Sequence, residues 1–126
     1  MESVVQELEG EKMFKKFKYM IEKNFELKRG FDSNKDITKD QINEFINKGA
    51  IFIDVRSPQE FREGHIDGAI SIPDYRFQKL IQQYSIDKES VVIVYCSTGH
   101  RSQRCQKVMQ NMGYKNVYNL YEGIII

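Results

Sequence analysis

A run of five apolar or aromatic residues, 91–95, constrains the fold of this chain more than any other stretch. Its residues are mostly β-branched, which is typical of a strand buried on both faces in a parallel sheet. The run ends at Cys96, and after a short polar loop Ser102 is a suitable N-cap for an amphipathic helix that we predict over residues 102–112. We therefore expect Cys96 at the carboxyl end of a central strand, at the edge where open α/β sheets bind their ligands.

The position predicted for Cys96 favours a reactive thiol. A helix N-terminus and nearby cations lower the pKa of a thiol and expose the thiolate. The loop up to Arg101 is too short for regular structure, so its successive amides can form an anion-binding nest, within which Gly99 permits a positive φ. An inert buried cysteine is the alternative. We favour a nucleophilic Cys96, because a buried strand, a glycine, an arginine and an N-cap residue follow one another at suitable spacing around it.

Positive charge gathers around this loop in the sequence. Between residues 90 and 121 there is no Asp or Glu, whereas four basic residues fall within that span. A cationic funnel of this kind favours anionic substrates. The four basic residues are Arg101, Arg104, Lys107 and Lys115.

Three segments resemble the signatures of one family. Residues 95–102, Tyr-Cys-Ser-Thr-Gly-His-Arg-Ser, resemble the active-site loop of single-domain rhodaneses, which are sulfurtransferases. Residues 54–61 and 64–73 resemble that family's two other signature segments, and the resemblance covers about residues 36–123. Strands also alternate with helical stretches along the chain. The alternation implies an α/β fold with a mostly parallel central sheet of about four to five strands and helices on both faces, and the resemblance implies that this fold is rhodanese-like.

The resemblance also implies roles for the loop residues. Cys96 is then the nucleophile that accepts a sulfane sulfur and holds it as a persulfide, and Arg101 braces the loop or faces the incoming anion. The implied donor is a small anion such as thiosulfate, the acceptor is cyanide or a thiol, and no dissociable cofactor is needed. The substrate-binding loop expected around the outer sulfur consists of Ser97, Thr98, Gly99, His100, Arg101 and Ser102.

The size of the loop separates this activity from related ones. Four residues lie between Cys96 and Arg101, which gives the six-membered loop that the resemblance associates with sulfur transfer. Related dual-specificity phosphatases and arsenate reductases carry one more residue, and their wider ring accepts a tetrahedral oxyanion. The loop also holds no carboxylic acid suited to acid catalysis. Phosphatase or arsenate reductase chemistry is therefore the less favoured enzyme activity.

Asp54 and Arg56 follow a second predicted strand, where a carboxylate and a guanidinium can bridge adjacent loops. We expect them to support the site rather than to catalyse. Glu60 is expected to pair with Arg56 or Arg62, as a charge on a solvated helix.

Three further side chains have both a functional and a structural interpretation. His65 is an acid or base, or, as we favour, a histidine that holds a turn by a hydrogen bond. His100 lies inside the loop and is expected either to tune the thiol or to contact substrate. Cys105 is either a resolving cysteine for Cys96 or, as we favour, a small buried hydrophobic residue.

The remaining elements follow from periodicity and stop signals. Thr38 is the predicted cap of the first helix, and Pro58 suits the first position of the second. Strands are predicted at 36–38, 51–55, 69–72, 91–95 and 116–120, and helices at 39–47, 58–63, 74–84 and 102–112.

Residues 1–35 are predicted to form an N-terminal amphipathic helical extension, followed by a rhodanese-like domain over 36–126. The family's usual final Gly-Gly pair is replaced by Glu122-Gly123, and the usual last helix does not follow. We expect the extension to cover the exposed sheet face, in cis or from a second subunit. The other interpretation is a catalytically weak binding or regulatory module that docks a protein partner, or self-associates, through this helix. The apolar face of this predicted N-terminal helix is rich in phenylalanine and comprises Leu8, Phe14, Phe17, Ile21 and Phe25.

Composition excludes several classes of protein. The net charge of +1 and the lack of a basic run argue against a nucleic-acid partner. No apolar stretch reaches transmembrane length, and no signal segment is evident, so we expect no membrane span. The two cysteines fit a reducing compartment, which makes the cytoplasm the expected location. Together with the two histidines they lack the paired spacings of a metal site.

Overall fold

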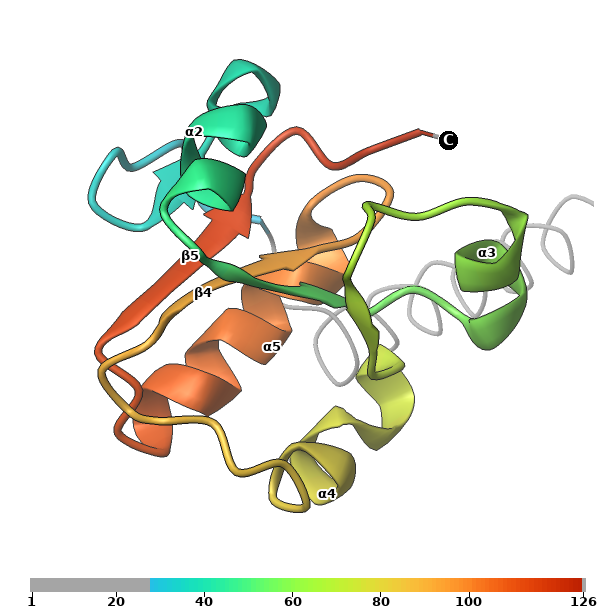
Figure 1. The fold of residues 1–126 in the computed structure, drawn as a ribbon, viewed down its shortest axis with the longest axis vertical. Helices are drawn as coiled ribbons and strands as arrows, with labels where there is room; N and C mark the ends of the chain where they lie inside the picture. Colours follow the sequence, from blue (N-terminus) through green and yellow to red (C-terminus); the bar gives the residue numbers. More distant parts are fainter. Residues whose placement is uncertain (1–27, 126) are drawn as a thin grey trace, which may run out of the picture.

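The computed structural model describes residues 28–125, which form one parallel five-stranded sheet in the order β1-β5-β4-β2-β3 (Figure 1). The prediction of an α/β fold with a parallel central sheet is thereby confirmed, whereas the predicted N-terminal helical extension lies largely outside the described residues. The strands are β1 (Asp36–Ile37), β2 (Ile51–Asp54), β3 (Ile70–Ser71), β4 (Val91–Tyr95) and β5 (Asn116–Leu120). The helices are α2 (Ile42–Asn47), α3 (Pro58–Glu63), α4 (Phe77–Ile81) and α5 (His100–Asn111), with 3₁₀ turns η1 (Lys39–Gln41) and η2 (Asp74–Arg76).

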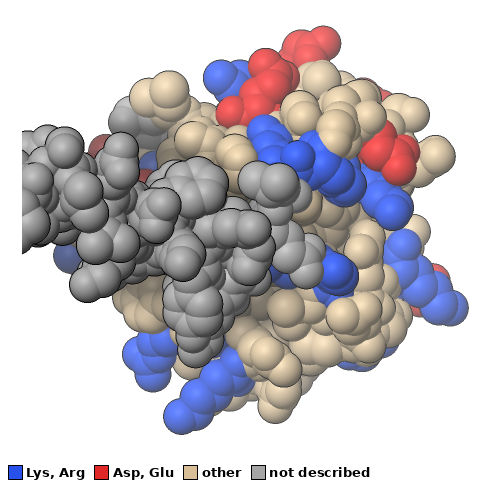
Figure 2. All heavy atoms as spheres, turned by 180° about the vertical axis from the view of Figure 1, so that it is seen from behind, with Lys and Arg blue, Asp and Glu red and all other residues tan. Residues whose placement is uncertain are grey.

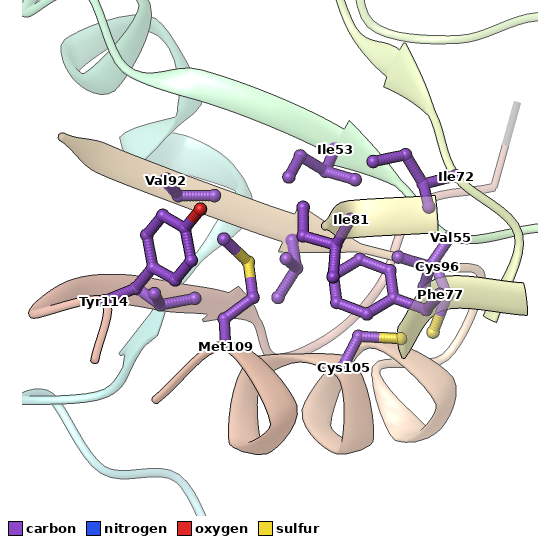
Figure 3. Close-up of a cluster of buried hydrophobic side chains, with 12 residues drawn as sticks. Ile53, Val55, Ile72, Phe77, Ile81, Val92, Cys96, Cys105, Met109 and Tyr114 are labelled. Atoms are coloured by element: carbon purple, nitrogen blue, oxygen red, sulfur yellow. The ribbon is translucent and has the colours of Figure 1, made fainter. Parts of the chain in front are cut away.

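The central position of β4 explains its unbroken apolar sequence. It pairs with β2 on one side and β5 on the other, and Val92 to Tyr95 are fully buried. Successive side chains alternate between the faces of a strand. Val92 and Val94 therefore pack with α4 and α5, whereas Ile93 and Tyr95 face the side covered by α2. The same alternation directs Cys96 to the α5 side of the sheet (Figure 3).

A second, smaller cluster of buried hydrophobic residues lies between the sheet and α2. The hydroxyl of Tyr95 accepts a hydrogen bond from the Ile66 amide at 3.1 Å, so this buried polar group is satisfied. Burial raises the pKa of that phenol and keeps it neutral. The cluster comprises Ile37, Phe52, Ile66, Ile93, Tyr95 and Leu120, with Ile42 and Phe45 of α2 packed against it.

The helix boundaries differ from the prediction at three places. The α5 helix begins at His100 and its N-cap is Gly99, so Ser102 is not the cap as predicted. The loop turns so tightly that the helix starts two residues earlier, which places Ser102 in the first turn with its side chain buried. The helices predicted at 39–47 and 74–84 both begin as 3₁₀ turns.

The chain after β5 lies along the loop that follows Cys96. The amide of Ile124 donates to the Cys96 carbonyl at 2.9 Å. Gly123 has a φ of +72°, and a Cβ there would lie 2.2 Å from the Ser97 carbonyl oxygen. A glycine is therefore required at 123 because the two backbones come too close for any side chain.

Residues 28–31 also pack against this part of the molecule. Arg29 pairs with the buried carboxylate of Asp36 and donates to Gln106 Oε1 of α5 at 3.0 Å. The ring of Phe31 meets that of Tyr121 edge to face, with 5.5 Å between centroids. The division of the chain at residue 35 stays a prediction. Across residues 28–125, every helix is too short or too polar to cross a lipid bilayer.

Candidate active site

Cys96 lies at the carboxyl end of β4, fully buried, with two polar partners at its sulfur. The Gly99 amide donates to Sγ at 3.0 Å, and the Ser102 hydroxyl forms a hydrogen bond with Sγ at 3.3 Å. Both partners are suited to stabilise a negative charge on sulfur. Of the predicted ring of loop amides, only that of Gly99 donates to this sulfur among the described residues.

The conformation of Gly99 makes that hydrogen bond possible. Its φ of +88° lies in the left-handed region, and a Cβ there would lie 2.2 Å from the Tyr121 carbonyl oxygen. The Gly99 carbonyl accepts from Asn119 Nδ2 at 3.2 Å and from the Gln103 amide at 3.1 Å. The glycine is thus fixed from β5 on one side and from α5 on the other.

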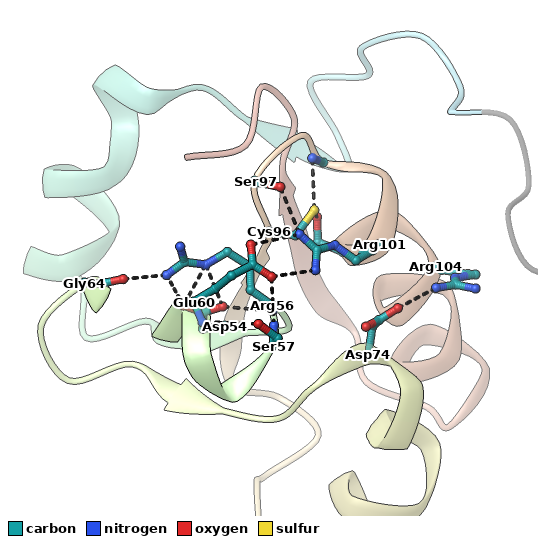
Figure 4. A network of polar contacts seen from close by, with 12 residues as sticks. Asp54, Arg56, Ser57, Glu60, Gly64, Asp74, Cys96, Ser97, Arg101 and Arg104 are labelled. Atoms are coloured by element: carbon teal, nitrogen blue, oxygen red, sulfur yellow. Dashed lines mark hydrogen bonds and ion pairs between the residues drawn. The ribbon is translucent and has the colours of Figure 1, made fainter. Parts of the chain in front are cut away.

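Arg101 braces the loop from its other end (Figure 4). Its guanidinium donates to both carboxylate oxygens of Glu60, at 3.0 and 3.3 Å, and to Ser97 Oγ at 2.9 Å. Hydrogen bonding from Arg101 lowers the pKa of the Glu60 carboxyl to about 2. The predicted pairing of Glu60 with Arg56 or Arg62 is therefore wrong, because α3 directs Glu60 toward the loop.

Asp54 and Arg56 form a second, buried ion pair at the end of β2 (Figure 4). The guanidinium contacts both oxygens of Asp54, the shortest distance being 2.7 Å, and also donates to the Gly64 carbonyl at 2.6 Å. Hydrogen bonding to Asp54 raises the pKa of Arg56. The pair fixes the chain after α3 to the end of β2, and so helps to position Glu60. Its bridging of adjacent loops agrees with the supporting role expected from the sequence.

Three of the four basic residues that predicted the cationic funnel are paired with carboxylates. Besides Arg101, Arg104 pairs with Asp74 at 2.7 Å, and Lys115, which precedes β5 at the edge of the sheet opposite Cys96, pairs with Glu89 at 2.6 Å. The carboxylates come from segments outside residues 90–121, which the linear sequence did not reveal. Figure 2 shows acidic and basic side chains next to each other in the upper part of one face. The prediction of a cationic funnel around Cys96 is therefore wrong, because carboxylates pair with most of the basic residues on which it rested.

The two histidines make local contacts. His65 Nδ1 donates to the Phe61 carbonyl at 2.7 Å, and its ring stacks on that of Phe61 with 3.6 Å between centroids. His100 is exposed, with Nδ1 at 3.2 Å from Thr98 Oγ1. His65 thus has the turn-holding geometry that the sequence favoured, whereas His100 lies on the outer side of the loop.

Cys105 is buried in the core between α5 and α4 (Figure 3). Burial raises the pKa of its thiol, which disfavours the reactive thiolate. A pocket of about 320 Å³ lined by Phe77, Arg104 and Cys105 opens beside it. This surrounding agrees with the favoured interpretation of Cys105 as a packing residue.

Comparison with known proteins identifies the family. The model of the rhodanese-like domain matches residues 38–124. The tRNA uridine(34) hydroxylase of Yersinia pestis is 33% identical over 91 residues, which is 68% of this chain and 26% of that protein. The chain thus spans about a quarter of the length of this curated relative.

Solved structures give the same result. A structure described as rhodanese with anions from E. coli has a TM-score of 0.52 and 36% identity, covering 56% of this chain and 82% of that one. The human single-domain sulfurtransferase TSTD1 has a TM-score of 0.64 over 71% of this chain and 90% of that one; its 22% identity shows likeness of fold. The chain belongs to the rhodanese-like domain family.

Proposed function

We propose that this protein is a sulfurtransferase that carries sulfane sulfur on Cys96. The Cys96 thiolate attacks the outer sulfur of a donor such as thiosulfate, the sulfur–sulfur bond of the donor breaks, and sulfite leaves with the bonding electron pair. Cyanide or a thiolate acceptor then attacks the outer sulfur of the persulfide, and the Cys96 thiolate is released. No cofactor is required for these two displacements.

The observation that carries this proposal is the hydrogen bond from the Gly99 amide to Cys96 Sγ at 3.0 Å. A fixed N–H at this position stabilises a thiolate before attack and a persulfide anion after it. The Ser102 hydroxyl at 3.3 Å adds a second donor. The short loop between Cys96 and Arg101 supports a single sulfur atom as its occupant rather than a tetrahedral oxyanion.

Turnover of thiosulfate and cyanide tests the proposal. We expect the wild-type protein to release sulfite and thiocyanate, Cys96→Ser to release neither, and Cys105→Ala to retain the wild-type rate. Turnover by Cys96→Ser would remove Cys96 from the role. Absence of turnover by the wild type would favour a binding or regulatory module. Hydrolysis of an aryl phosphate, or reduction of arsenate, would instead favour the oxyanion enzymes.

The proposal also covers the reactants, the compartment and the partners of the protein. The donor is a small anion, the acceptor is cyanide or a thiol, and no nucleic acid takes part. The unpaired thiols of Cys96 and Cys105 support a reducing compartment such as the cytoplasm. A protein partner or a second copy of the chain, bound through the N-terminal helix, remains a prediction that removal of residues 1–27 tests through oligomeric state and stability.

A second candidate function comes from the curated relatives. Because a tRNA uridine(34) hydroxylase matches this chain at 33% identity, the alternative function is tRNA modification, with tRNA as the substrate. Incubation in the presence of molecular oxygen, as the oxidant, with tRNA that lacks the modification, followed by nucleoside mass spectrometry, tests it. Hydroxylated uridine that depends on Cys96 would favour this alternative, whereas thiocyanate formation without hydroxylation favours sulfur transfer.

A further inference from the structure

The peptide unit that joins Thr98 to Gly99 is held at both ends. Its N–H donates to Cys96 Sγ at 3.0 Å, and its carbonyl oxygen accepts from Lys28 Nζ at 2.8 Å. In a trans peptide the N–H and the C=O point in opposite directions, and none of the described peptide bonds is cis. The grip on the carbonyl therefore fixes the direction of the N–H that contacts the sulfur.

Lys28 reaches this peptide from outside the part of the chain that the family model matches. It precedes the residues that the family model matches, 38–124, and yet contacts the loop after β4. Its ammonium also donates to the Tyr121 carbonyl at 2.5 Å and lies 3.8 Å from the centroid of the Tyr121 ring. These contacts hold the side chain of Lys28 between the end of β5 and the loop.

We propose that Lys28 is a positioning residue for the active loop, and that it sets the orientation and strength of the Gly99 N–H as a donor to Cys96. The proposal rests on the role of Cys96 as the nucleophile. A hydrogen bond from an ammonium to a carbonyl is charge-assisted. It polarises the peptide and thereby strengthens the hydrogen bond made by the N–H at the opposite end.

Within residues 28–125, the other contacts that hold the loop act on groups other than the Thr98 carbonyl. Arg101 holds the Ser97 hydroxyl, and Asn119 together with Gln103 holds the carbonyl of the following peptide unit at Gly99. Lys28 is therefore connected to the sulfur of Cys96 through the single peptide plane between Thr98 and Gly99. A change in the placement of residue 28 is expected to change the reactivity of Cys96.

The test measures the Cys96 thiolate directly in the full-length chain. The ultraviolet absorbance of the thiolate is titrated with pH in wild type and Lys28→Met, and the curve of the matching Cys96→Ser protein is subtracted to remove Cys105 and the tyrosines. We expect the midpoint to rise by about 0.5 to 1 pH unit in Lys28→Met. Lys28→Arg keeps the charge and a hydrogen-bond donor, so its titration midpoint is expected to lie close to that of wild type.

Lys48→Met is the matched control. Lys48 also lies over an aromatic ring, that of Phe45 at 5.1 Å, and pairs with Glu44 on α2. We expect its titration midpoint to equal that of wild type. Circular dichroism and thermal unfolding verify that each variant is folded. An unchanged midpoint in folded Lys28→Met, or an equal shift in Lys48→Met, would overturn the proposal.

This readout is independent of sulfur transfer. If wild type forms thiocyanate while Lys28→Met titrates as wild type does, the positioning role fails and the proposed function stands. If wild type forms no thiocyanate while Lys28→Met shifts the midpoint, the proposed function fails and the coupling of Lys28 to Cys96 stands.

Discussion

Cys96 and Cys105 belong to the same buried cluster, yet the structure gives the two thiols different surroundings. Cys96 lies at the end of a strand, where the Gly99 amide and the Ser102 hydroxyl reach its sulfur. Cys105 lies within a helix, and burial raises the pKa of its thiol. Under the proposed function, the two polar partners at its sulfur, and not burial, therefore distinguish Cys96 from Cys105.

The two cysteines are also held in place by different kinds of contact. Cys105 is positioned by packing between α4 and α5. The loop of Cys96 is held by directed polar contacts from separate elements, namely Glu60 of α3, Asn119 of β5 and Lys28. Removal of these contacts is expected to affect Cys96 while it leaves Cys105 unchanged.

Replacement of Gly99 by alanine is expected to have the largest effect, because it disturbs the contacts of Cys96 and none of those of Cys105. The added Cβ meets the Tyr121 carbonyl oxygen at 2.2 Å, so the loop must move and the amide is withdrawn from the sulfur. We expect persulfide formation to slow by about tenfold or more, measured as sulfite release from thiosulfate. Gly113→Ala is the control, since Gly113 has a similar φ of +96° but no atom within 4 Å of the added Cβ. An equal loss of rate in both variants would contradict the role of the close approach.

Replacement of Cys105 by alanine tests the packing role of the second thiol. The sulfur is buried between α4 and α5, and its loss leaves a small cavity. We expect the free energy of unfolding to fall by about 1 to 2 kcal/mol, measured by urea denaturation, with no change in the rate of sulfite release. A loss of rate at unchanged stability would instead indicate a redox role.

Replacement of Ser102 by alanine removes one polar partner from Cys96 and none from Cys105. The hydroxyl at 3.3 Å from Sγ is buried, so water does not readily replace it. We expect sulfite release to slow by about fivefold, which corresponds to one hydrogen bond of about 1 kcal/mol. Ser102→Thr retains the hydroxyl and is expected to retain more of the rate. Equal rates for wild type and Ser102→Ala would remove Ser102 from the site.

Replacement of Glu60 by glutamine weakens the brace on Arg101 and gives the smallest effect. At pH 7 we expect the free energy of unfolding to fall by about 0.5 kcal/mol, because the pair is partly exposed and screened by solvent. Folding lowers the pKa of Glu60 from 4.5 to about 2. The stability that the carboxylate contributes is therefore fully present above pH 4.5 and is lost as the pH falls through about 2.

Urea denaturation at several pH values measures this dependence. The difference between wild type and Glu60→Gln is expected to shrink as the pH falls below 4.5. A difference that grows on acidification would have the wrong sign for a carboxylate stabilised by Arg101.

The sequence predicted the part of the site that depends on local pattern. The apolar run before Cys96 and the glycine after it are enough to place the thiol at the end of a central strand. Ser102 was expected as an N-cap because its residue type suits one, but the left-handed turn at Gly99 takes that position. A capping preference is weaker than the tight packing of this loop.

The contacts missed from the sequence join segments that are distant along the chain. Glu60 and Arg101 meet only because α3 packs beside the loop, and local helix spacing favoured other partners for Glu60. Asn119 gave one signal, since it is a polar residue two positions after Val117 and therefore on the same, buried face of β5. Lys28 gave none, because nothing in its own segment indicates that it contacts the loop at Thr98.

The most direct test of the account determines which of the two thiols carries the sulfur. After incubation with thiosulfate, tryptic cleavage following Arg101 and Arg104 separates Cys96 and Cys105 into different peptides for mass spectrometry. We predict a gain of one sulfur atom, removable by reductant, on the peptide that contains Cys96. A sulfur on the Cys105 peptide instead, or on neither, would contradict the account.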